Sequence, residues 1–280
     1  MTSVLRTLLN SCSPQTRPFL RTFSHISRMQ VVPVPCLSDN YAYLLVDSKT
    51  QQVTAVDPVD ASKVLSAVLS TGFPLTGILT THHHADHSGG NTKMQSAVPG
   101  IPVYGGDERI PAMTHRVEHG DEFTLGSFRI RAIRTPGHTT GSVCYFVEEE
   151  GEGEEGRAVF SGDTLFVGGC GRLFEGSAAD MHESLNVRLA ALPRDTRVYA
   201  GHEYTRANLR FALTVDPDNE RLRRKAEWCA KVQCTMPSSI AEELETNPFM
   251  RVHRPELQKA AAEADPVRVL AAIREMKDNF

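Results

Sequence analysis

The sequence predicts an α/β protein in which a sandwich of strands and helices is followed by a C-terminal helical domain. Between residues 29 and 204, short apolar runs rich in β-branched and aromatic residues alternate with stretches of helical spacing, whereas helical spacing alone continues beyond residue 205. Histidine-containing motifs follow several of the apolar runs, as expected for a sandwich whose loops carry a functional site. We therefore expect three segments, at residues 1–28, 29–204 and 205–280.

The first half of the sandwich is predicted to alternate strands with helices. Residues 40–46 and 53–56 are apolar runs with aromatic or β-branched members, which favour extended backbone. Apolar residues at positions 64, 65, 68 and 69 recur with helical spacing instead. The expected strands are residues 29–35, 40–46, 53–56 and 77–81, and a further helix is expected at residues 91–97.

The second half of the sandwich is predicted to be richer in strands. Phe128, Ile130 and Ala132 alternate with arginines, which is the pattern of a half-buried strand. Further strands are expected at residues 142–147, 158–161 and 197–200, and a helix from residue 180 would carry its apolar residues 181, 185, 189 and 192 on one face.

Beyond residue 205 the pattern predicts helices alone. Ser239 and Glu242 have the spacing of a capping box, which would start a helix at this point. Pro266, directly after Asp265, suits the first turn of another helix. The expected helices are residues 205–215, 220–233, 239–246 and 266–279.

Composition and charge argue against two classes of protein. The chain has 280 residues, of which 40% are hydrophobic and 23% are charged, as in ordinary globular proteins. No apolar run approaches the ~18 residues that a membrane span requires, so we expect no membrane partner. The formal charge is −4 for the whole chain and +4 for residues 1–28, which leaves −8 for the remainder. A body this acidic is a poor partner for nucleic acid, which requires a basic surface.

Residues 1–28 have the composition of a mitochondrial transit peptide. They contain four arginines, several serines and threonines and no acidic residue, since the first acid of the chain is Asp39. We expect cleavage after Phe23 and delivery to the mitochondrial matrix. Met29 begins a strand-like segment, so initiation there would give a complete cytosolic form. A disordered cytosolic tail is the alternative interpretation of this extension.

The clearest functional signal is the segment His82-His83-His84-Ala85-Asp86-His87, directly after a predicted buried strand. In extended backbone, residues two apart point the same way, so His82 and His84 converge while His83 faces away. Asp86 and His87 follow the turn and can approach a second position. Imidazole and carboxylate groups are the ligands that Zn²⁺ and similar divalent ions prefer.

Three further candidate ligands lie in loop-like contexts farther along the chain. His138 lies in Thr-Pro-Gly-His, Asp163 in Phe-Ser-Gly-Asp-Thr and His202 in Tyr-Ala-Gly-His-Glu. The chain thus offers seven ligands, enough for two metals that share one carboxylate.

The six cysteines include no Cys-x-x-Cys pair, so we expect reduced thiols. Cys170 is an alternative source of a nucleophile, but no residue near it in the sequence is an obvious base for it.

These motifs resemble those of the metallo-β-lactamase superfamily. The motif at residues 82–87 is followed in order by Gly-His-Thr-x-Gly, Gly-Asp-Thr-Leu-Phe and Gly-His-Glu-Tyr-Thr. Within the superfamily, residues 162–176 (GDTLFVGGCGRLFEG) are similar to the hydroxyacylglutathione hydrolases, or glyoxalase II enzymes, and the likeness extends from about residue 29 to residue 280. The resemblance implies a four-layer αβ/βα sandwich followed by a C-terminal helical domain that binds substrate.

The same resemblance implies a binuclear thioester hydrolase that converts S-D-lactoylglutathione, and other S-2-hydroxyacylglutathiones, to glutathione and D-lactate or the matching acid. This is the second step of methylglyoxal detoxification by the glyoxalase pathway. The expected cofactors are two divalent metal ions per chain, zinc first, with iron or manganese as alternatives. Asp57 is expected to hold a ligand imidazole or a loop rather than to coordinate. The implied ligands are His82, His84 and His138 for the first ion and Asp86, His87 and His202 for the second, with Asp163 bridging both together with a water or hydroxide.

Recognition of glutathione, which carries two carboxylates, requires cations and hydrogen-bond donors. The resemblance assigns this role to Arg172, Phe174, Tyr204, Arg274 and Lys277. Arg274 and Lys277 are three residues apart and lie on one face of a predicted helix, although an exposed face with ordinary salt bridges is the alternative. Arg172 and Phe174 stand where the animal enzymes have a lysine and a tyrosine, and the second exchange removes a hydroxyl group.

Three other functions stay open at this stage. A glutathione persulfide dioxygenase with one iron shares the His-x-His-x-Asp-His motif, but it lacks the Gly-Cys-Gly-Arg-Leu-Phe-Glu-Gly segment and a terminal helix like residues 271–280. The charge of −8 disfavours a metal-dependent nuclease, and the full set of seven ligands disfavours a non-catalytic binding protein. We expect a small-molecule substrate and a monomer.

Overall fold

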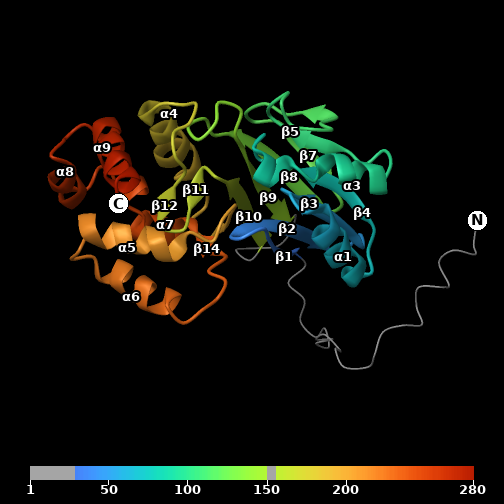
Figure 1. Ribbon diagram of the computed structural model, residues 1–280, viewed down its shortest axis with the longest axis horizontal. Helices are drawn as coiled ribbons and strands as arrows, with labels where there is room; N and C mark the ends of the chain where they lie inside the picture. The colour runs from blue at the N-terminus through green and yellow to red at the C-terminus, as the bar shows by residue number, and fades with distance from the viewer. Residues whose placement is uncertain (1–28, 150–155) are drawn as a thin grey trace, which may run out of the picture.

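The computed structural model describes residues 29–149 and 156–280, so the predicted transit segment lies outside the described residues (Figure 1). The first of two six-stranded sheets has the order β1-β2-β3-β4-β5-β6. The first three strands pair antiparallel, and β3 to β6 pair parallel. Its strands are β1 (Met29–Cys36), β2 (Asn40–Asp47), β3 (Gln52–Val56), β4 (Leu75–Leu79), β5 (Val103–Gly105) and β6 (His115–Arg116).

The second sheet has the order β14-β13-β10-β9-β8-β7. Only β10 and β13 are parallel neighbours in it, so their carboxyl ends lie at the same edge of the sheet. A separate two-stranded hairpin consists of β11 (Leu165–Phe166) and β12 (Gly169–Cys170). The strands of the second sheet are β7 (Glu122–Leu125), β8 (Phe128–Arg134), β9 (Val143–Glu149), β10 (Arg157–Gly162), β13 (Arg197–Ala200) and β14 (Ser238–Ser239).

The two sheets pack face to face, and helices cover the outer face of the first. Tyr43 and Leu45 of β2 lie in the core between the sheets with Phe160 of β10. Leu44 and Val46, which alternate with them, pack on the other face beneath α1 (Ala61–Thr71) and α3 (Asn91–Ala97). Because both faces are covered, β2 is buried along its whole length, which explains its continuous apolar run.

Helices on the outer face of the second sheet complete the four layers. Phe146 and Val159 of this sheet share one apolar cluster with Leu185, Phe211 and Ile273, which come from the helices on this side. The predicted αβ/βα sandwich is confirmed, and the C-terminal helices pack directly on it. These elements are α4 (Ala178–His182), the π-helical η2 (Glu183–Leu189), α5 (Thr205–Val215), α6 (Glu220–Cys229), α7 (Ile240–Thr246), the 3₁₀ turn η3 (Pro248–Met250), α8 (Pro255–Ala261) and α9 (Pro266–Asp278).

The C-terminal region differs from its prediction in three details. It is not helical alone, because β14 pairs with β13 and extends the second sheet. The helix expected at residues 220–233 ends at Cys229, since the chain must leave it to reach β14. α8 was not predicted. The predicted starts hold: Ser239 caps α7 by accepting from the backbone N–H of Glu242, and Asp265 caps α9 ahead of Pro266.

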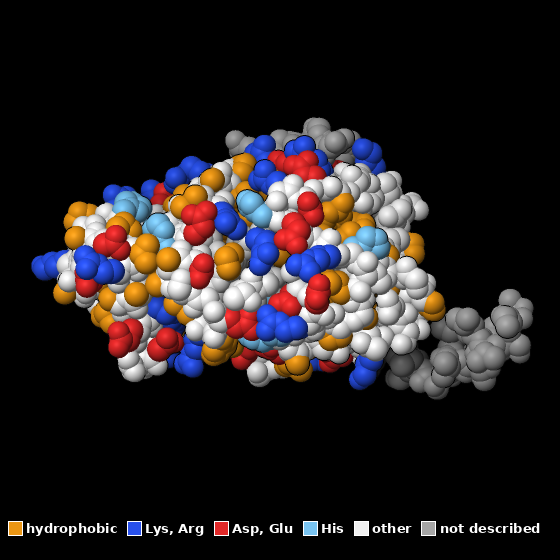
Figure 2. Space-filling view, turned by 90° about the horizontal axis from the view of Figure 1, so that it is seen from above, with side chains coloured by type: hydrophobic (Ala, Val, Ile, Leu, Met, Phe, Trp, Pro, Cys, Tyr) orange, Lys and Arg blue, Asp and Glu red, His pale blue; other side chains and the backbone are white. Residues whose placement is uncertain are grey.

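The surface agrees with the charge pattern of the sequence. On the face shown in Figure 2, basic and acidic side chains are interspersed and do not separate into a basic stripe of the kind that nucleic-acid binding requires. Among residues 29–149 and 156–280, no helix is both long enough and apolar enough to cross a membrane.

Candidate metal centre

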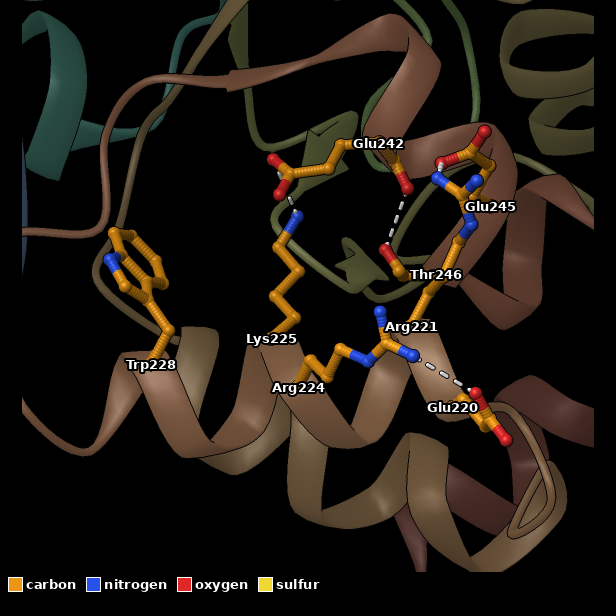
Figure 3. Close-up of a pocket in the computed structure, with 8 residues that line it drawn as sticks. All are labelled: Glu220, Arg221, Arg224, Lys225, Trp228, Glu242, Glu245 and Thr246. Carbon is orange, nitrogen blue, oxygen red and sulfur yellow. Dashed lines mark hydrogen bonds and ion pairs between the residues drawn. The ribbon is translucent and has the colours of Figure 1, made fainter.

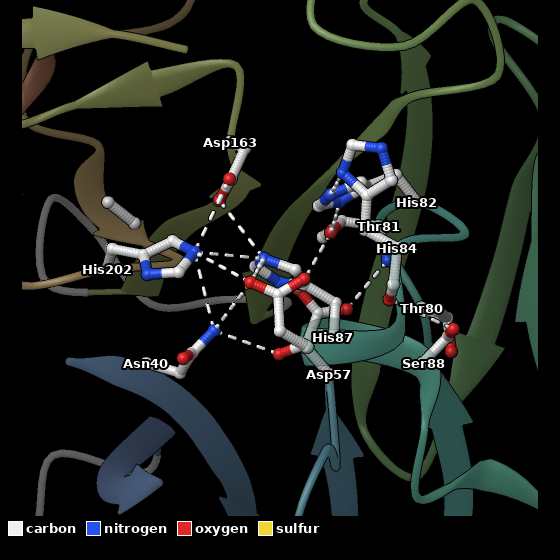
Figure 4. A network of polar contacts seen from close by, with 12 residues as sticks. Asn40, Asp57, Thr80, Thr81, His82, His84, His87, Ser88, Asp163 and His202 are labelled. Carbon is white, nitrogen blue, oxygen red and sulfur yellow. Dashed lines mark hydrogen bonds and ion pairs between the residues drawn. The ribbon is translucent and has the colours of Figure 1, made fainter. Parts of the chain in front are cut away.

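The predicted ligands meet at one edge of the sandwich, where strands of both sheets end. Figure 4 shows His82, His84, His87, Asp163 and His202 of this set. β4 ends at Leu79 and leads into His82 through two buried threonines. Asp163 directly follows β10, and His202 follows β13. Because β10 and β13 are parallel neighbours, these two side chains emerge at the same sheet edge. His138 joins them from the loop between β8 and β9.

The first group consists of His82, His84 and His138, whose ligand atoms lie within 4.8 Å of one another. Nε2 of His82 lies 3.1 Å from Nδ1 of His84, and Nε2 of His138 lies 3.0 Å from the same atom. His83 points elsewhere, with its ring nitrogens 3.6 Å from Asp107 and 3.7 Å from Glu175. The alternation predicted for extended backbone therefore holds at this position.

The second group consists of Asp86, His87 and His202, again within 4.8 Å of one another. Nε2 of His87 lies 3.2 Å from Nε2 of His202. Oδ2 of Asp86 lies 3.5 Å from Nε2 of His202 and 3.8 Å from Nε2 of His87. The side-chain amide of Asn40 donates to this carboxylate at 3.2 Å and to the backbone carbonyl of Asp86 at 2.9 Å, which fixes the carboxylate in place.

Asp163 lies between the two groups. Its Oδ1 is 3.2 Å from Nε2 of His87, and its Oδ2 is 3.4 Å from Nε2 of His202 and 3.6 Å from Nε2 of His138. Oδ1 is buried and has no hydrogen-bond partner among the described residues, which is costly for a carboxylate oxygen unless a cation faces it. Gly201 leaves room for it, because a Cβ there would lie 2.5 Å from Oδ1 of Asp163 and 2.6 Å from Cε1 of His87.

Four histidines point Nε2 toward the candidate metal centre, and the Nδ1 atom of each contacts a polar group outside the centre. Such outer contacts set the tautomer and the ring orientation of metal-binding histidines. Asp57 holds His87 as predicted, whereas sequence reasoning missed Asp39 and Asn40, which resemble ordinary residues at a strand connection. The outer partners are Oγ1 of Thr81 for His82 at 3.1 Å, Oδ2 of Asp57 for His87 at 3.0 Å, the backbone carbonyl of Arg172 for His138 at 2.9 Å and Oδ1 of Asp39 for His202 at 2.7 Å.

The charges of the centre suit a cation. Burial alone would raise the pKa of Asp163, but the imidazoles of His87 and His202 hold it well below its usual range. Burial opposes charge on His202 too, yet the carboxylates of Asp163 and Asp86 raise its pKa to about 10. Without a metal, protons on these imidazoles balance the carboxylates. Divalent cations can replace those protons, so the donor set fits divalent metal ions.

A pocket of about 420 Å³ opens beside the first group of ligands. Its lining includes His138 and Asp163 of the candidate centre and residues of the last helix, α9. The five residues predicted to bind substrate all line this pocket: Arg172, Phe174, Tyr204, Arg274 and Lys277.

Aromatic rings form one part of the pocket wall. Tyr204 stacks on His202 with ring centroids 4.6 Å apart, and burial raises the pKa of Tyr204 to about 12. Its hydroxyl is therefore protonated at neutral pH and can donate a hydrogen bond. Phe174 is 63% exposed and lies 5.2 Å from the ring of His138, so it covers the metal centre from the solvent side.

The three cations of the pocket differ in how far they are engaged. Arg172 is exposed and pairs with Asp278 at 3.2 Å. Arg274 is only 6% exposed and donates to the backbone carbonyl of Cys170 at 2.8 Å, but its Nε has no partner among the described residues. Lys277 is partly exposed, and its ammonium lies 3.5 Å from the carbonyl of Ala207. The alternative of a fully exposed helix face is thus wrong for Arg274.

Cys170 does not meet the requirements of a nucleophile. The residue is 3% exposed, and burial raises the pKa of its thiol to about 11, against the influence of the neighbouring Arg274. At neutral pH it is a thiol, which reacts far more slowly than a thiolate.

Comparison with known proteins agrees with this geometry. The metallo-beta-lactamase superfamily profile matches residues 42–202, and that of the hydroxyacylglutathione hydrolase C-terminus matches residues 203–280. The chain is 47% identical to a cytoplasmic hydroxyacylglutathione hydrolase of Arabidopsis thaliana, over 90% of this chain and 99% of the relative. It is 44% identical to a hydroxyacylglutathione hydrolase-like protein of Gallus gallus, over 90% of both chains.

Solved structures show the same architecture. ETHE1 from Myxococcus xanthus superposes with a TM-score of 0.61 at 27% identity, over 87% of this chain and all 100% of that one. TTHA1623 in a di-iron-bound form superposes with a TM-score of 0.54 at 26% identity, over 78% of this chain and 98% of that one. The fold, the His and Asp groups and the two family profiles agree. The chain belongs to the hydroxyacylglutathione hydrolase family of the metallo-β-lactamase superfamily.

Proposed function

We propose that this protein hydrolyses the thioester bond of S-D-lactoylglutathione and of other S-2-hydroxyacylglutathiones. Water adds to the acyl carbon, the C–S bond breaks, and the products are glutathione and D-lactate or the corresponding 2-hydroxy acid. The observation that carries this proposal is the pocket beside the centre. Its lining combines three cations, Arg172, Arg274 and Lys277, with the predicted ligands His138 and Asp163.

We assign two divalent metal ions to the centre, with zinc as the expected metal and iron or manganese as alternatives. His82, His84 and His138 would hold one ion, Asp86, His87 and His202 the other, and Asp163 would bridge them. When bound, two such ions would supply an acidified water as nucleophile and polarise the thioester carbonyl. Seven ligands divided into two groups around one carboxylate exceed the needs of a single ion.

The protein's own residues would bind and orient the substrate. Lys277 and Arg172 would offer donors to the two carboxylates of glutathione, and the buried Arg274 would add positive charge to the pocket wall. The phenol of Tyr204 is a neutral donor beside His202. Phe174 would shield the reacting carbonyl from bulk water. Thiolate is a good leaving group, so little general-acid assistance is required at the sulfur.

Hydrolysis of S-D-lactoylglutathione by the purified, metal-loaded protein tests this function directly. We expect loss of the thioester absorbance and release of one thiol per turnover. The competing dioxygenase reaction would instead consume oxygen in the presence of glutathione persulfide. Oxygen consumption without thioester hydrolysis would overturn the proposal.

We further propose a separate function for each of the three segments of the chain. Residues 29–204 would form the catalytic domain, and residues 205–280 the helical domain that binds substrate, since Arg274 and Lys277 come from α9. Residues 1–28 would direct the protein to the mitochondrial matrix, and initiation at Met29 would give a cytosolic form. We propose that the enzyme acts as a monomer.

A further inference from the structure

The hairpin of β11 and β12 joins the metal centre to the substrate pocket. Asp163 precedes it, and Cys170 at its end lines the pocket. The ring of Phe166 contacts Tyr204 edge-on, with centroids 5.2 Å apart, and meets His202 at 6.0 Å. The position of this hairpin therefore determines the shape of the pocket wall.

The tip of the hairpin, residues 166–169, is held by polar side chains of the C-terminal helical region. Oε2 of Glu243 accepts from the backbone N–H of Gly168 at 2.8 Å. The side-chain amide of Asn247 donates to the carbonyls of Phe166 and Gly169 at 3.1 and 2.9 Å. These contacts satisfy backbone groups that a buried turn cannot leave unpaired.

Glu243 is the centre of this arrangement. It is 0% exposed, and its second oxygen, Oε1, accepts from Nζ of Lys225 at 2.8 Å. Its Oε2 also accepts from Asn247 at 3.0 Å. Because a buried carboxylate without partners is strongly unfavourable, these contacts leave Glu243 one well-defined orientation.

Lys225 reaches Glu243 from the neighbouring helix, α6. It also pairs with Glu242 at 3.2 Å, and Figure 3 shows it crossing toward α7 at a surface pocket of about 570 Å³. The other cations of that pocket are paired with acids, Arg221 with Glu245 and Arg224 with Glu220. The pocket therefore gives no sign of a ligand, and its relevance is that Lys225 supports Glu243 there.

We propose that Glu243 is a positioning residue for substrate binding. By holding the β11–β12 tip, it would fix Phe166 and the carbonyl of Cys170, which in turn holds Arg274 at 2.8 Å. Glu243 contacts neither the pocket nor the metal ligands itself, so its effect would pass through the hairpin. This inference rests on the proposed function, because the pocket is the proposed glutathione site.

A second buried ion pair in the same region provides a matched control. Asp216, which follows α5, pairs with Arg251, and their side chains are 5% and 7% exposed. The side chains of Lys225 and Glu243 are 4% and 0% exposed. Among the described residues, the side chain of Asp216 bonds to Asn219 and Arg251 and has no hydrogen bond or ion pair with residues 163–176. Asp216→Asn should therefore destabilise the fold without moving the hairpin.

The experiment compares Glu243→Ala, Glu243→Gln and Asp216→Asn in the metal-loaded enzyme. We measure KM and kcat for S-D-lactoylglutathione and for a simple thioester, together with metal content and Tm. Glu243→Ala should raise KM for the glutathione thioester by roughly 10-fold at full metal content, because displaced binding groups weaken binding. Glu243→Gln keeps an acceptor for Gly168, so its KM should stay within about 2-fold of the wild type, whereas loss of the charge that pairs with Lys225 should lower its Tm.

Two results would overturn the proposal: an unchanged KM in folded Glu243→Ala, or an equal rise in Asp216→Asn. If Glu243→Ala does not fold, Asn247→Ala decides in its place, since it removes the contacts to Phe166 and Gly169. A wild-type protein without hydrolase activity would overturn the proposed function instead. In that case the role of Glu243 is judged from calorimetric binding of S-methylglutathione, a non-hydrolysable thioether, to the same variants, with the same expected order.

Discussion

Oδ2 of Asp57 lies 3.0 Å from Nδ1 of His87, on the side of the ring opposite the Nε2 atom that faces Asp163. Asp57 also accepts from the backbone N–H and the hydroxyl of Thr81, at 2.8 and 2.7 Å. One carboxylate thus orients an imidazole of the second ligand group and the loop that leads to His82 in the first. Asp57 has φ of +48°, a left-handed conformation that Asp and Asn adopt more readily than other residues.

Asp57→Asn is expected to lower metal affinity by about 10- to 100-fold, because it removes the charge that supports His87 while the backbone conformation is kept. Titration against a competing chelator measures this loss. Asp57→Ala should in addition lower Tm, since alanine is strained at this φ. Wild-type affinity for both metals in Asp57→Asn would contradict the assigned role.

Asp163→Ala should lower metal content and abolish hydrolysis together. Its carboxylate lies within 3.6 Å of ring nitrogens from both ligand groups, so neither ion would keep its full set of ligands. Elemental analysis alongside the hydrolysis assay checks the prediction. A variant that still holds two metals per chain would refute a bridging role.

Lys277→Ala and Arg274→Ala should both raise KM for the glutathione thioester, but only the second should also lower Tm. Lys277 is partly exposed, so we expect its loss to raise KM by about 10-fold, with kcat nearly unchanged. Arg274 is buried and holds the Cys170 carbonyl, so its replacement also leaves a buried acceptor unpaired. A simple thioester lacking glutathione should be hydrolysed at nearly wild-type rates by Lys277→Ala. Equal losses on both substrates would indicate a structural role.

Once the metals are removed, the stability of the protein should fall as the pH becomes alkaline. In the metal-free centre the pKa of His202 is raised from 6.5 to about 10 by carboxylates, so its protonated form stabilises the fold. Protonated His202 contributes fully to the free energy of unfolding below about pH 6.5. This contribution is lost as pH rises toward 10. Tm of the chelated protein should therefore fall over this range, while the loaded protein, whose imidazoles carry no such proton, should not follow it. Parallel curves for the two forms would contradict this account.

A protein that begins at Met29 should retain full hydrolase activity. Met29 is buried and pairs with Asp47 as the first residue of β1, and every candidate site residue follows it. Fusion of residues 1–28 to a fluorescent reporter should send the reporter to mitochondria. A purely cytosolic reporter would refute targeting, and loss of activity on truncation would refute dispensability.

Local patterns in the sequence were sufficient to predict much of the architecture. α3 has the predicted bounds, because two glycines directly precede it and Pro99 follows it closely, and these residues limit how far a helix can extend. The convergence of His82 and His84 could be predicted because it depends on alternation within one short segment. Asp265 and Ser239 started their helices as expected, since a cap acts on the backbone only three residues away.

The remaining features depend on contacts between distant residues. Asp39 supports His202 across 163 positions, and neither residue carries a sign of the other in the sequence. Glu243 stands among other glutamates on α7, yet it is the fully buried one that reaches Gly168, 75 positions away. β6 and β14 are too short to show the alternation of apolar and polar residues that indicates a strand. They are recognised only by their pairing with neighbouring strands.

The apolar cluster that joins the second sheet to α5 and α9 has a consequence for how such enzymes can diversify. Cutting the chain after residue 204 would separate Phe146 and Val159 from Phe211 and Ile273, so each piece would lose part of this shared cluster. Exchange of the helical region between sandwiches of this fold would therefore have to preserve matching apolar residues on both sides of this contact. New substrate ranges are more accessible by point substitution around the pocket, which leaves that shared interior intact.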